Sequence, residues 1–264
     1  MNLKESTDKL RAYLDLDRMP VGIKFLKTKK DYDNFDADTR ENKITYCNSI
    51  HFASMGQKLK LSDTHQACGK GAVAVGLRDE PKPMANGMAR YKFGAYDSLE
   101  TSKDVADKMD FIKEDFYGYA AMPLDEFKED PDVVIVISKS YNVMRLIQGY
   151  AYKHGNTAKI NTVGLQALCR DLTSYVYNED TINISFLCPG TRLVANWKQD
   201  ELGFATSFSA WYDIVEGIIK TTNPFERDKN KEKIVEKLPE NEKDSIEFGK
   251  NYDTGSYEGG KVEE

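Results

Sequence analysis

Four cysteines are the residues of this chain best suited to carry chemistry: Cys47, Cys68, Cys169 and Cys188. Twenty residues separate the first two and eighteen separate the last two, so they form two pairs of nearly equal spacing. In each pair the first cysteine opens an aromatic-rich segment, and the second lies in a glycine turn before an apolar run ("CGKGAVAVGL" and "CPGTRLVANW"). Paired spacing of this kind favours ligands of a metal centre over four unrelated core thiols.

The spacing also bears on the kind of metal. Zinc sites usually take two thiolates from one short C-x(2 to 4)-C segment, and the chain has none. An iron-sulfur cluster can be held by single cysteines on separate elements, where backbone N–H groups bond its sulfides. Gly69, Gly71 and Gly190 beside two of the cysteines suit such turns. We therefore expect a cluster, with 4Fe-4S preferred to zinc. Arg192 could balance an anionic cluster, bind a substrate carboxylate or form a surface ion pair.

The number of ligands separates two classes of function. Four cysteine ligands would saturate a cluster and leave electron transfer or redox sensing as its use, with a redox protein as partner. Three ligands would leave one iron open to act as a Lewis acid in an enzyme. The predicted site therefore supports either class.

Metal-free readings of the same residues remain open. The cysteines could be inert core thiols, with a small anionic molecule bound by the glycine turns and the segment 138–142. A catalytic thiol is the third reading, and it would need His51 or His65 as its base.

The elements that position these residues are expected to be both helices and strands. The apolar run 133–137 predicts a strand buried on both faces, followed by a helix that Gly155 ends. Further strands are expected at Val21–Leu26, 181–187 and 202–208, and further helices at 3–16, 101–116 and 210–222. These elements predict a mixed α/β (α+β) fold.

An internal repeat would explain the paired cysteines. The segments "LRAYLDLDRMPVGIKF" and "PLDEFKEDPDVVIVI" share a polar-acidic lead, a proline and a strand. We predict two diverged half-repeats, roughly 1–95 and 119–215, packed about an approximate two-fold axis that gathers the cysteines at one seam. They would form a single domain, 1–225, before a charged, partly flexible tail, 226–264.

Composition limits the partners. The 264-residue chain carries a formal net charge of -6, which argues against nucleic acid or an anionic membrane as a partner. It has no secretory leader pattern and no run of about eighteen apolar residues. We expect a cytoplasmic protein whose thiols stay reduced, with a homodimer among its expected assemblies.

Several motifs together resemble the uncharacterised ArCR family, domain of unknown function 169, of archaea and anaerobic bacteria. The matching pieces cover about residues 5–220: "PVGIKFL", Tyr46-Cys47, "CGKGAVAVGL", "PLDEF" before "DPDVVIVI", "NVMRLIQGYAY", Cys169 and "CPGTR" ending at Arg192. The resemblance implies a cysteine at each of the four positions and an oxygen-poor setting in which a cluster survives. It implies no reaction.

Overall fold

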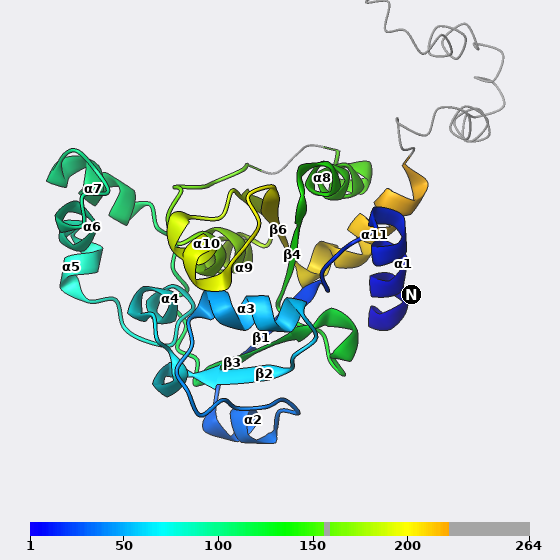
Figure 1. The fold of residues 1–264 in the computed structure, drawn as a ribbon, viewed down its shortest axis with the longest axis horizontal. Coiled ribbons are helices and arrows are strands. Elements are labelled where there is room, and N and C mark those ends of the chain that lie inside the picture. Colours follow the sequence, from blue (N-terminus) through cyan, green and yellow to red (C-terminus); the bar gives the residue numbers. More distant parts are fainter. Residues whose placement is uncertain (156–158, 222–264) are drawn as a thin grey trace, which may run out of the picture.

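A six-stranded antiparallel sheet is the centre of the molecule, in the order β2-β3-β1-β4-β6-β5 (Figure 1). The computed structural model describes residues 1–155 and 159–221, so the predicted tail lies outside the described residues. The strands are β1 (Val21–Leu26), β2 (Leu59–Ser62), β3 (Gly118–Pro123), β4 (Val133–Lys139), β5 (Ile182–Ser185) and β6 (Glu201–Ser207).

Helices cover both faces of the sheet. On one face lie α3 (Tyr46–Ser54), α4 (Gly69–Ala74), a π-helix (Ala167–Ser174) that continues into α9 (Tyr175–Glu179), and α10 (Pro189–Ala195). The other face carries α1 (Leu3–Leu14), α8 (Ser140–His154) and α11 (Trp211–Lys220). Because both faces are covered, the apolar side chains 133–137 of β4 are all buried, as predicted.

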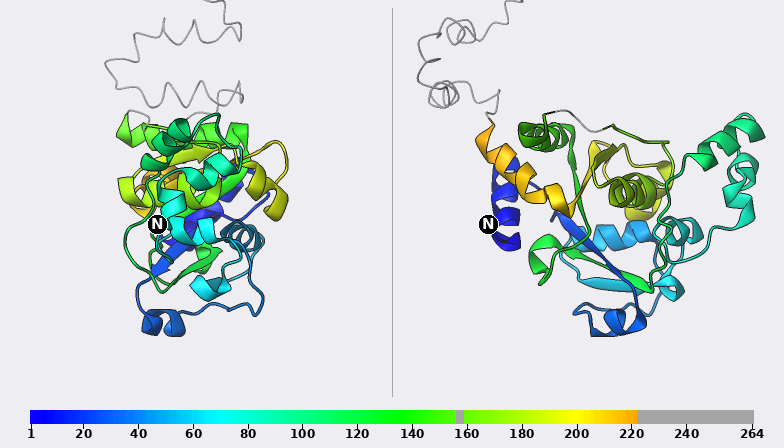
Figure 2. Two further views of the ribbon diagram at one scale, coloured as in Figure 1. Left: turned by 90° about the vertical axis from the view of Figure 1, so that its left-hand side faces the viewer. Right: turned by 180° about the vertical axis from the view of Figure 1, so that it is seen from behind.

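Shorter elements complete the described chain. Helix α2 (Lys29–Asn34) packs beside β1 and β3, and 3-10 turns occur at Asp63–His65, Leu124–Glu126 and Phe208–Ala210. Helices α5 (Lys82–Ala85), α6 (Met88–Lys92) and α7 (Leu99–Asp107) project to one side of the sheet (Figure 2). None of the described helices is long and apolar enough to span a bilayer.

The predicted mixed α/β fold class is confirmed, with every predicted strand present. From the central β1–β4 pair, β3 and then β2 follow on one side, and β6 and then β5 follow on the other. Strands β1 to β3, which end at Pro123, form one half of the sheet, and strands β4 to β6, which begin at Val133, form the other half. The predicted second half-repeat, 119–215, begins inside β3 instead. The two-fold relation between the halves stays a prediction.

The helix predicted at 101–116 was wrong in its second half, because α7 ends first. The chain that follows pairs with the end of α4: the Ile112 amide donates to the Ala74 carbonyl at 3.1 Å, and the Phe116 amide to the Gly76 carbonyl at 2.9 Å. The apolar residues of this segment are buried in the core beneath α4. Their helical spacing therefore reflects core contacts of an irregular segment.

One close helix crossing gives a stability prediction. Where α8 meets α11, a Cβ built on Gly217 would overlap the Gly149 carbonyl. Because backbone cannot move aside cheaply, Gly217→Ala should destabilise the protein by about 1–3 kcal/mol in urea unfolding. Gly190→Ala is the matched control, since its Cβ would meet only Cys188 Sγ, at 4.0 Å. Equal stability of the two variants would contradict the close crossing.

Candidate functional site

Each of the four cysteines lies in the first turn of a helix. Cys47 is the second residue of α3, and Cys169 is the third residue of the π-helix. Cys68 and Cys188 are the N-cap residues of α4 and α10. These four helical elements cover the same face of the sheet (Figure 1). The fold therefore gathers thiols from widely separated parts of the chain on one side of the sheet.

Hydrogen bonds join the elements that carry the cysteines. They run between Tyr46 Oη and Thr173 Oγ1 (2.8 Å), from Asn48 Nδ2 to the Val194 carbonyl (2.5 Å), and from Gln166 Nε2 to the Lys70 carbonyl (3.3 Å). The first joins α3 to the π-helix, the second joins α3 to α10, and the third joins the π-helix N-cap to α4. The relative positions of the cysteines are therefore set by direct bonds between their elements.

The thiols interact electrostatically. Burial raises the pKa of Cys47 to about 12; a hydrogen bond from Thr191 opposes this rise, and the charges of Cys188 and Cys68 add to it. Burial also raises the pKa of Cys169 well above its usual range, and all three other cysteines contribute to that rise. Cys47 and Cys169 are therefore the two thiols whose ionisation the other cysteines disfavour.

This environment opposes a catalytic thiol at Cys47 or Cys169, because a nucleophilic cysteine needs a lowered pKa. Of the histidines considered as bases, His65 has a bonded ring nitrogen, whereas His51 Nδ1 is buried without a hydrogen-bond partner among the described residues. His65 Nδ1 lies 3.1 Å from the Ser62 amide, which donates to it, and the His51 ring packs at 5.0 Å against Trp197. Burial therefore disfavours the thiolate form of both cysteines.

Two of the three predicted glycines border a sulfur atom. A Cβ on Gly71 would lie 3.9 Å from Cys68 Sγ and 3.3 Å from Tyr46 Cβ, and one on Gly190 would lie 4.0 Å from Cys188 Sγ. Both glycines therefore lie in contact range of an N-cap thiol. Gly69 differs, because its Cβ would meet the Arg78 guanidinium at 3.2 Å.

Arg192 binds backbone carbonyls. Its guanidinium donates to the carbonyls of Phe186 (2.8 Å), Leu187 (3.2 Å), Lys198 (2.5 Å) and Glu201 (2.9 Å). These bonds tie the turn before Cys188 to the start of β6. Arg192 thus positions the cysteine turn, and its contact with a cluster or a carboxylate stays a prediction.

The π-helix around Cys169 is a feature that sequence patterns did not reveal. Gln166 precedes it with a left-handed φ of 53°, and Thr173 Oγ1 donates to the Leu168 carbonyl at 2.8 Å, five residues earlier. π-Helical turns are rare and occur often at functional sites. Residues 167–174 are all buried, so this wide helix places Cys169 inside the core.

Arg90 is a second residue that sequence reasoning missed. It lies on α6, is only 2% exposed, and donates from Nη2 to Gln166 Oε1 at 2.7 Å. Burial lowers the pKa of Arg90. Negative charge on neighbouring groups, Cys169 among them, acts in the opposite direction and raises this pKa. In a segment as polar as "MARYK", an arginine is expected at the surface, so no sequence signal marked it as a buried cation near a cysteine.

The side-chain positions do not form a ready site for one ion. Within 1–155 and 159–221, no three His, Cys, Asp or Glu side chains are arranged to hold a metal ion. A tetrahedral zinc with Zn–S bonds of about 2.3 Å would need its thiolates about 4 Å apart. The positions of the thiols therefore do not match a single zinc ion.

The anionic-ligand reading pointed to segment 138–142. Its polar groups bond each other, because Asn142 Nδ2 donates to Ser138 Oγ at 2.8 Å and both residues are buried. Lys139 is the N-cap of α8, and Ser140 is its first residue.

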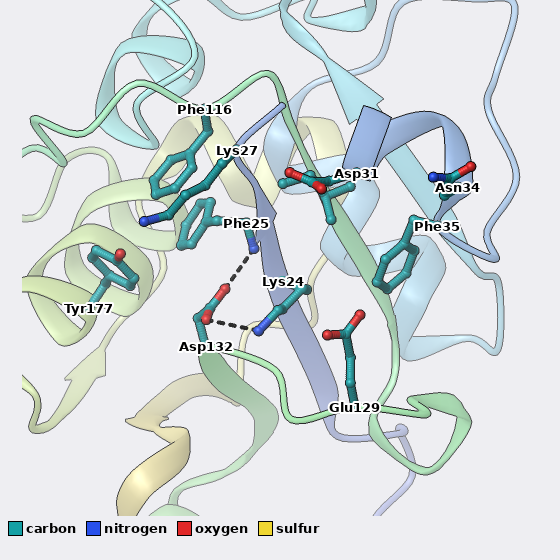
Figure 3. Close-up of a pocket in the computed structure, with 11 residues that line it drawn as sticks. Lys24, Phe25, Lys27, Asp31, Asn34, Phe35, Phe116, Glu129, Asp132 and Tyr177 are labelled. Atoms are coloured by element: carbon teal, nitrogen blue, oxygen red, sulfur yellow. Dashed lines mark hydrogen bonds and ion pairs between the residues drawn. The ribbon is translucent and has the colours of Figure 1, made fainter. Parts of the chain in front are cut away.

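A separate pocket of about 460 Å³ lies beside β1 (Figure 3). Its charged lining is more acidic than basic, with Lys24 and Lys27 against Asp31, Glu129 and Asp132. Asp132 already accepts the Phe25 amide at 2.7 Å and Lys24 Nζ at 3.3 Å. This lining does not favour a small anion.

Comparison with known proteins gives the same family as the motifs. The profile of the uncharacterised ArCR family matches residues 9–217. The uncharacterized protein MJ0308 of Methanocaldococcus jannaschii is 30% identical over 222 residues, which cover 82% of this chain and 93% of that protein. No solved structure matches. The family profile spans the sheet, the helices on both of its faces and all four cysteines, and the chain belongs to the ArCR family.

Proposed function

We propose that Cys47, Cys68, Cys169 and Cys188 bind an iron-sulfur cluster, of the 4Fe-4S type, and that the protein has a redox role in electron transfer or sensing. The observation that carries the proposal is the position of the four thiols, each at the start of a different helix on the same face of the sheet. The site offers thiol sulfur, which suits iron-sulfur clusters.

The choice of a cluster over a single ion is supported by the spread of the four thiols over separate helices. A cubane is larger than one ion, so its four cysteines stand farther apart than zinc ligands do. Gly71 and Gly190 lie next to the sulfurs of Cys68 and Cys188, where glycine allows backbone to approach a bound group closely. Neither N-cap cysteine in the described structure accepts a hydrogen bond from its own helix, so the first-turn amides stay available to sulfide.

The chain supplies charge and exclusion of water. A cluster with four thiolates is anionic, and the buried Arg90 guanidinium near Cys169 offsets part of that charge. Cys169 is only 5% exposed, so the protein would limit the access of water and oxygen to this side of the cluster. When bound, the cluster would accept and release one electron. The proposal places the protein in the reducing cytoplasm of an organism that lives without oxygen.

Anaerobic purification followed by iron, sulfide and zinc analysis tests this function. We expect about four iron and four sulfide per chain, with a broad visible absorption that dithionite bleaches. Chemical reconstitution with iron and sulfide should restore any cluster lost on handling. A colourless protein that holds no iron after reconstitution would refute the proposal, and one zinc per chain would replace the cluster with a zinc site.

A further inference from the structure

Helix α10 has an unusual surface, because its exposed side is apolar. Leu193 is 84% exposed and Val194 is 42% exposed, and Phe186 in the preceding turn is 62% exposed. Pro189 and Gly190, at the start of the helix, are exposed as well. We call these five residues the α10 face.

The inward side of the same helix is partly polar. Thr191 is 1% exposed, and its Oγ1 accepts a hydrogen bond from Trp197 Nε1 at 3.0 Å, while Ala195 is 2% exposed. A helix on the surface of a globular protein usually buries its apolar side chains and exposes its polar ones. Helix α10 instead exposes Leu193 and Val194 while it buries Thr191, and an exposed apolar patch is typical of a contact surface.

The turn before α10 holds Phe186, Leu187 and Cys188 in succession. Leu187 has a left-handed φ of 61° and is 4% exposed, so the chain turns Leu187 into the core between two outward neighbours. One neighbour is Phe186 and the other is Cys188, which is partly exposed. Cys188 therefore lies between the apolar side chains of the α10 face.

The α10 face carries no free charge. Arg192 is the only charged residue from 186 to 196, and its guanidinium is bonded to four backbone carbonyls. Depletion of charge is typical of the core of a protein interface. An uncharged surface of this kind contrasts with the formal net charge of -6 on the chain.

We infer that a small electron-transfer protein docks on the α10 face and exchanges one electron with the proposed cluster through Cys188. The inference rests on the proposed function. A stable interface usually engages about 20–30 residues on each side, whereas weak electron-transfer contacts are smaller. A face of five residues therefore fits a transient redox partner better than a second copy of the chain. In the exchange, the reduced partner loses one electron and the cluster gains it, and no bond forms or breaks.

The test uses a small ferredoxin as the protein probe and reduced methyl viologen as the small-molecule control. The variants are Leu193→Glu and Phe186→Glu, which place a charge on the exposed surface without disturbing the core. Tyr13→Glu is the matched control, because Tyr13 is 57% exposed on α1, across the sheet. Iron content of every variant is measured first, and each variant should hold as much iron as the unchanged protein.

In stopped-flow experiments, both α10 variants should be reduced at least about ten-fold more slowly by ferredoxin, a loss of about 1.4 kcal/mol. Reduction by viologen should stay unchanged, as should both rates of Tyr13→Glu. Direct titration of oxidised ferredoxin should show binding weakened by a similar factor. Because the face is uncharged, the ferredoxin rate should not fall as salt is raised.

Several results would overturn the inference. One is a ferredoxin rate that both α10 variants leave unchanged, and another is an unchanged protein that ferredoxin neither binds nor reduces. A stable dimer that Leu193→Glu separates would assign the face to a second copy. These failures differ from failure of the proposed function, in which the unchanged protein itself holds no cluster.

Discussion

Replacing Cys169 by alanine is expected to remove more than about nine-tenths of the iron and sulfide from anaerobically prepared protein. Cys169 is the most buried of the four thiols, and the chain has no fifth cysteine that could replace it as a ligand. Because metal binding contributes directly to folding free energy, the variant should also lose the thermal stabilisation that cluster loading gives the unchanged protein. Iron analysis and thermal unfolding of loaded and metal-free samples measure both effects.

The metal-free samples provide the control. A neutral buried cysteine packs as a small apolar group, so Cys169→Ala should cost far less in protein without metal. If the cysteine serves packing alone, the unfolding temperatures of the variant and the unchanged protein will differ by the same amount with and without reconstitution. That outcome would favour the reading of the cysteines as inert core residues.

The same substitution at the other three cysteines decides the number of ligands. We expect Cys47→Ala, Cys68→Ala and Cys188→Ala each to lose iron as Cys169→Ala does. A single variant that keeps its cluster would identify a cysteine that is not a ligand. Such a result would favour an enzyme with an open iron site over an electron carrier.

Replacing Asp171 by alanine is expected to destabilise the protein by about 3–5 kcal/mol, because it leaves the buried Arg170 guanidinium without its nearest carboxylate. Both side chains are fully buried, and Arg170 Nη1 lies 3.1 Å from Asp171 Oδ1. Burial raises the pKa of Asp171, and hydrogen bonds from Thr162 and Arg170 oppose the rise. The pair lies in the π-helix beside Cys169, so the variant should also take up less iron. Urea unfolding and iron analysis check the two effects.

Two comparisons sharpen this test. Asp36→Ala removes an exposed ion pair with Lys128 and should change stability little. The double variant Arg170→Met with Asp171→Leu should recover much of the loss, because it removes both buried charges. If Asp171→Ala has the same free energy of unfolding as the unchanged protein, the buried charge pair is contradicted. If the double variant does not recover stability, the loss comes from packing instead of charge.

Local patterns were sufficient for four of the strands and for the choice of candidate residues, whereas β2 and β3 were not predicted. A run of five apolar residues predicted β4, and Gly155 marked the end of α8, where it is the C-cap. The nearly equal spacing of the two cysteine pairs singled them out before any element was placed. Such signals are readable because strand burial and helix termination depend on residues within a few positions of one another.

The early end of α7 shows where local patterns fail. Its sequence continues with helical spacing, yet Ile112 and Phe116 bond to the end of α4 instead. The wide turn of the π-helix, the burial of Arg90 and the outward apolar side of α10 are likewise invisible in a window of neighbouring residues.

The amino-acid sequence by itself determined the fold class, four of the six strands of the described sheet and the helices α1, α8 and α11, and it singled out the candidate ligands. Only the tertiary structure decided which face of the sheet holds the four cysteines, which cation lies near them and which apolar side chains stay exposed. The physical reason is that periodicity reports how one element meets the core, whereas proximity between distant thiols depends on how separate elements pack against each other.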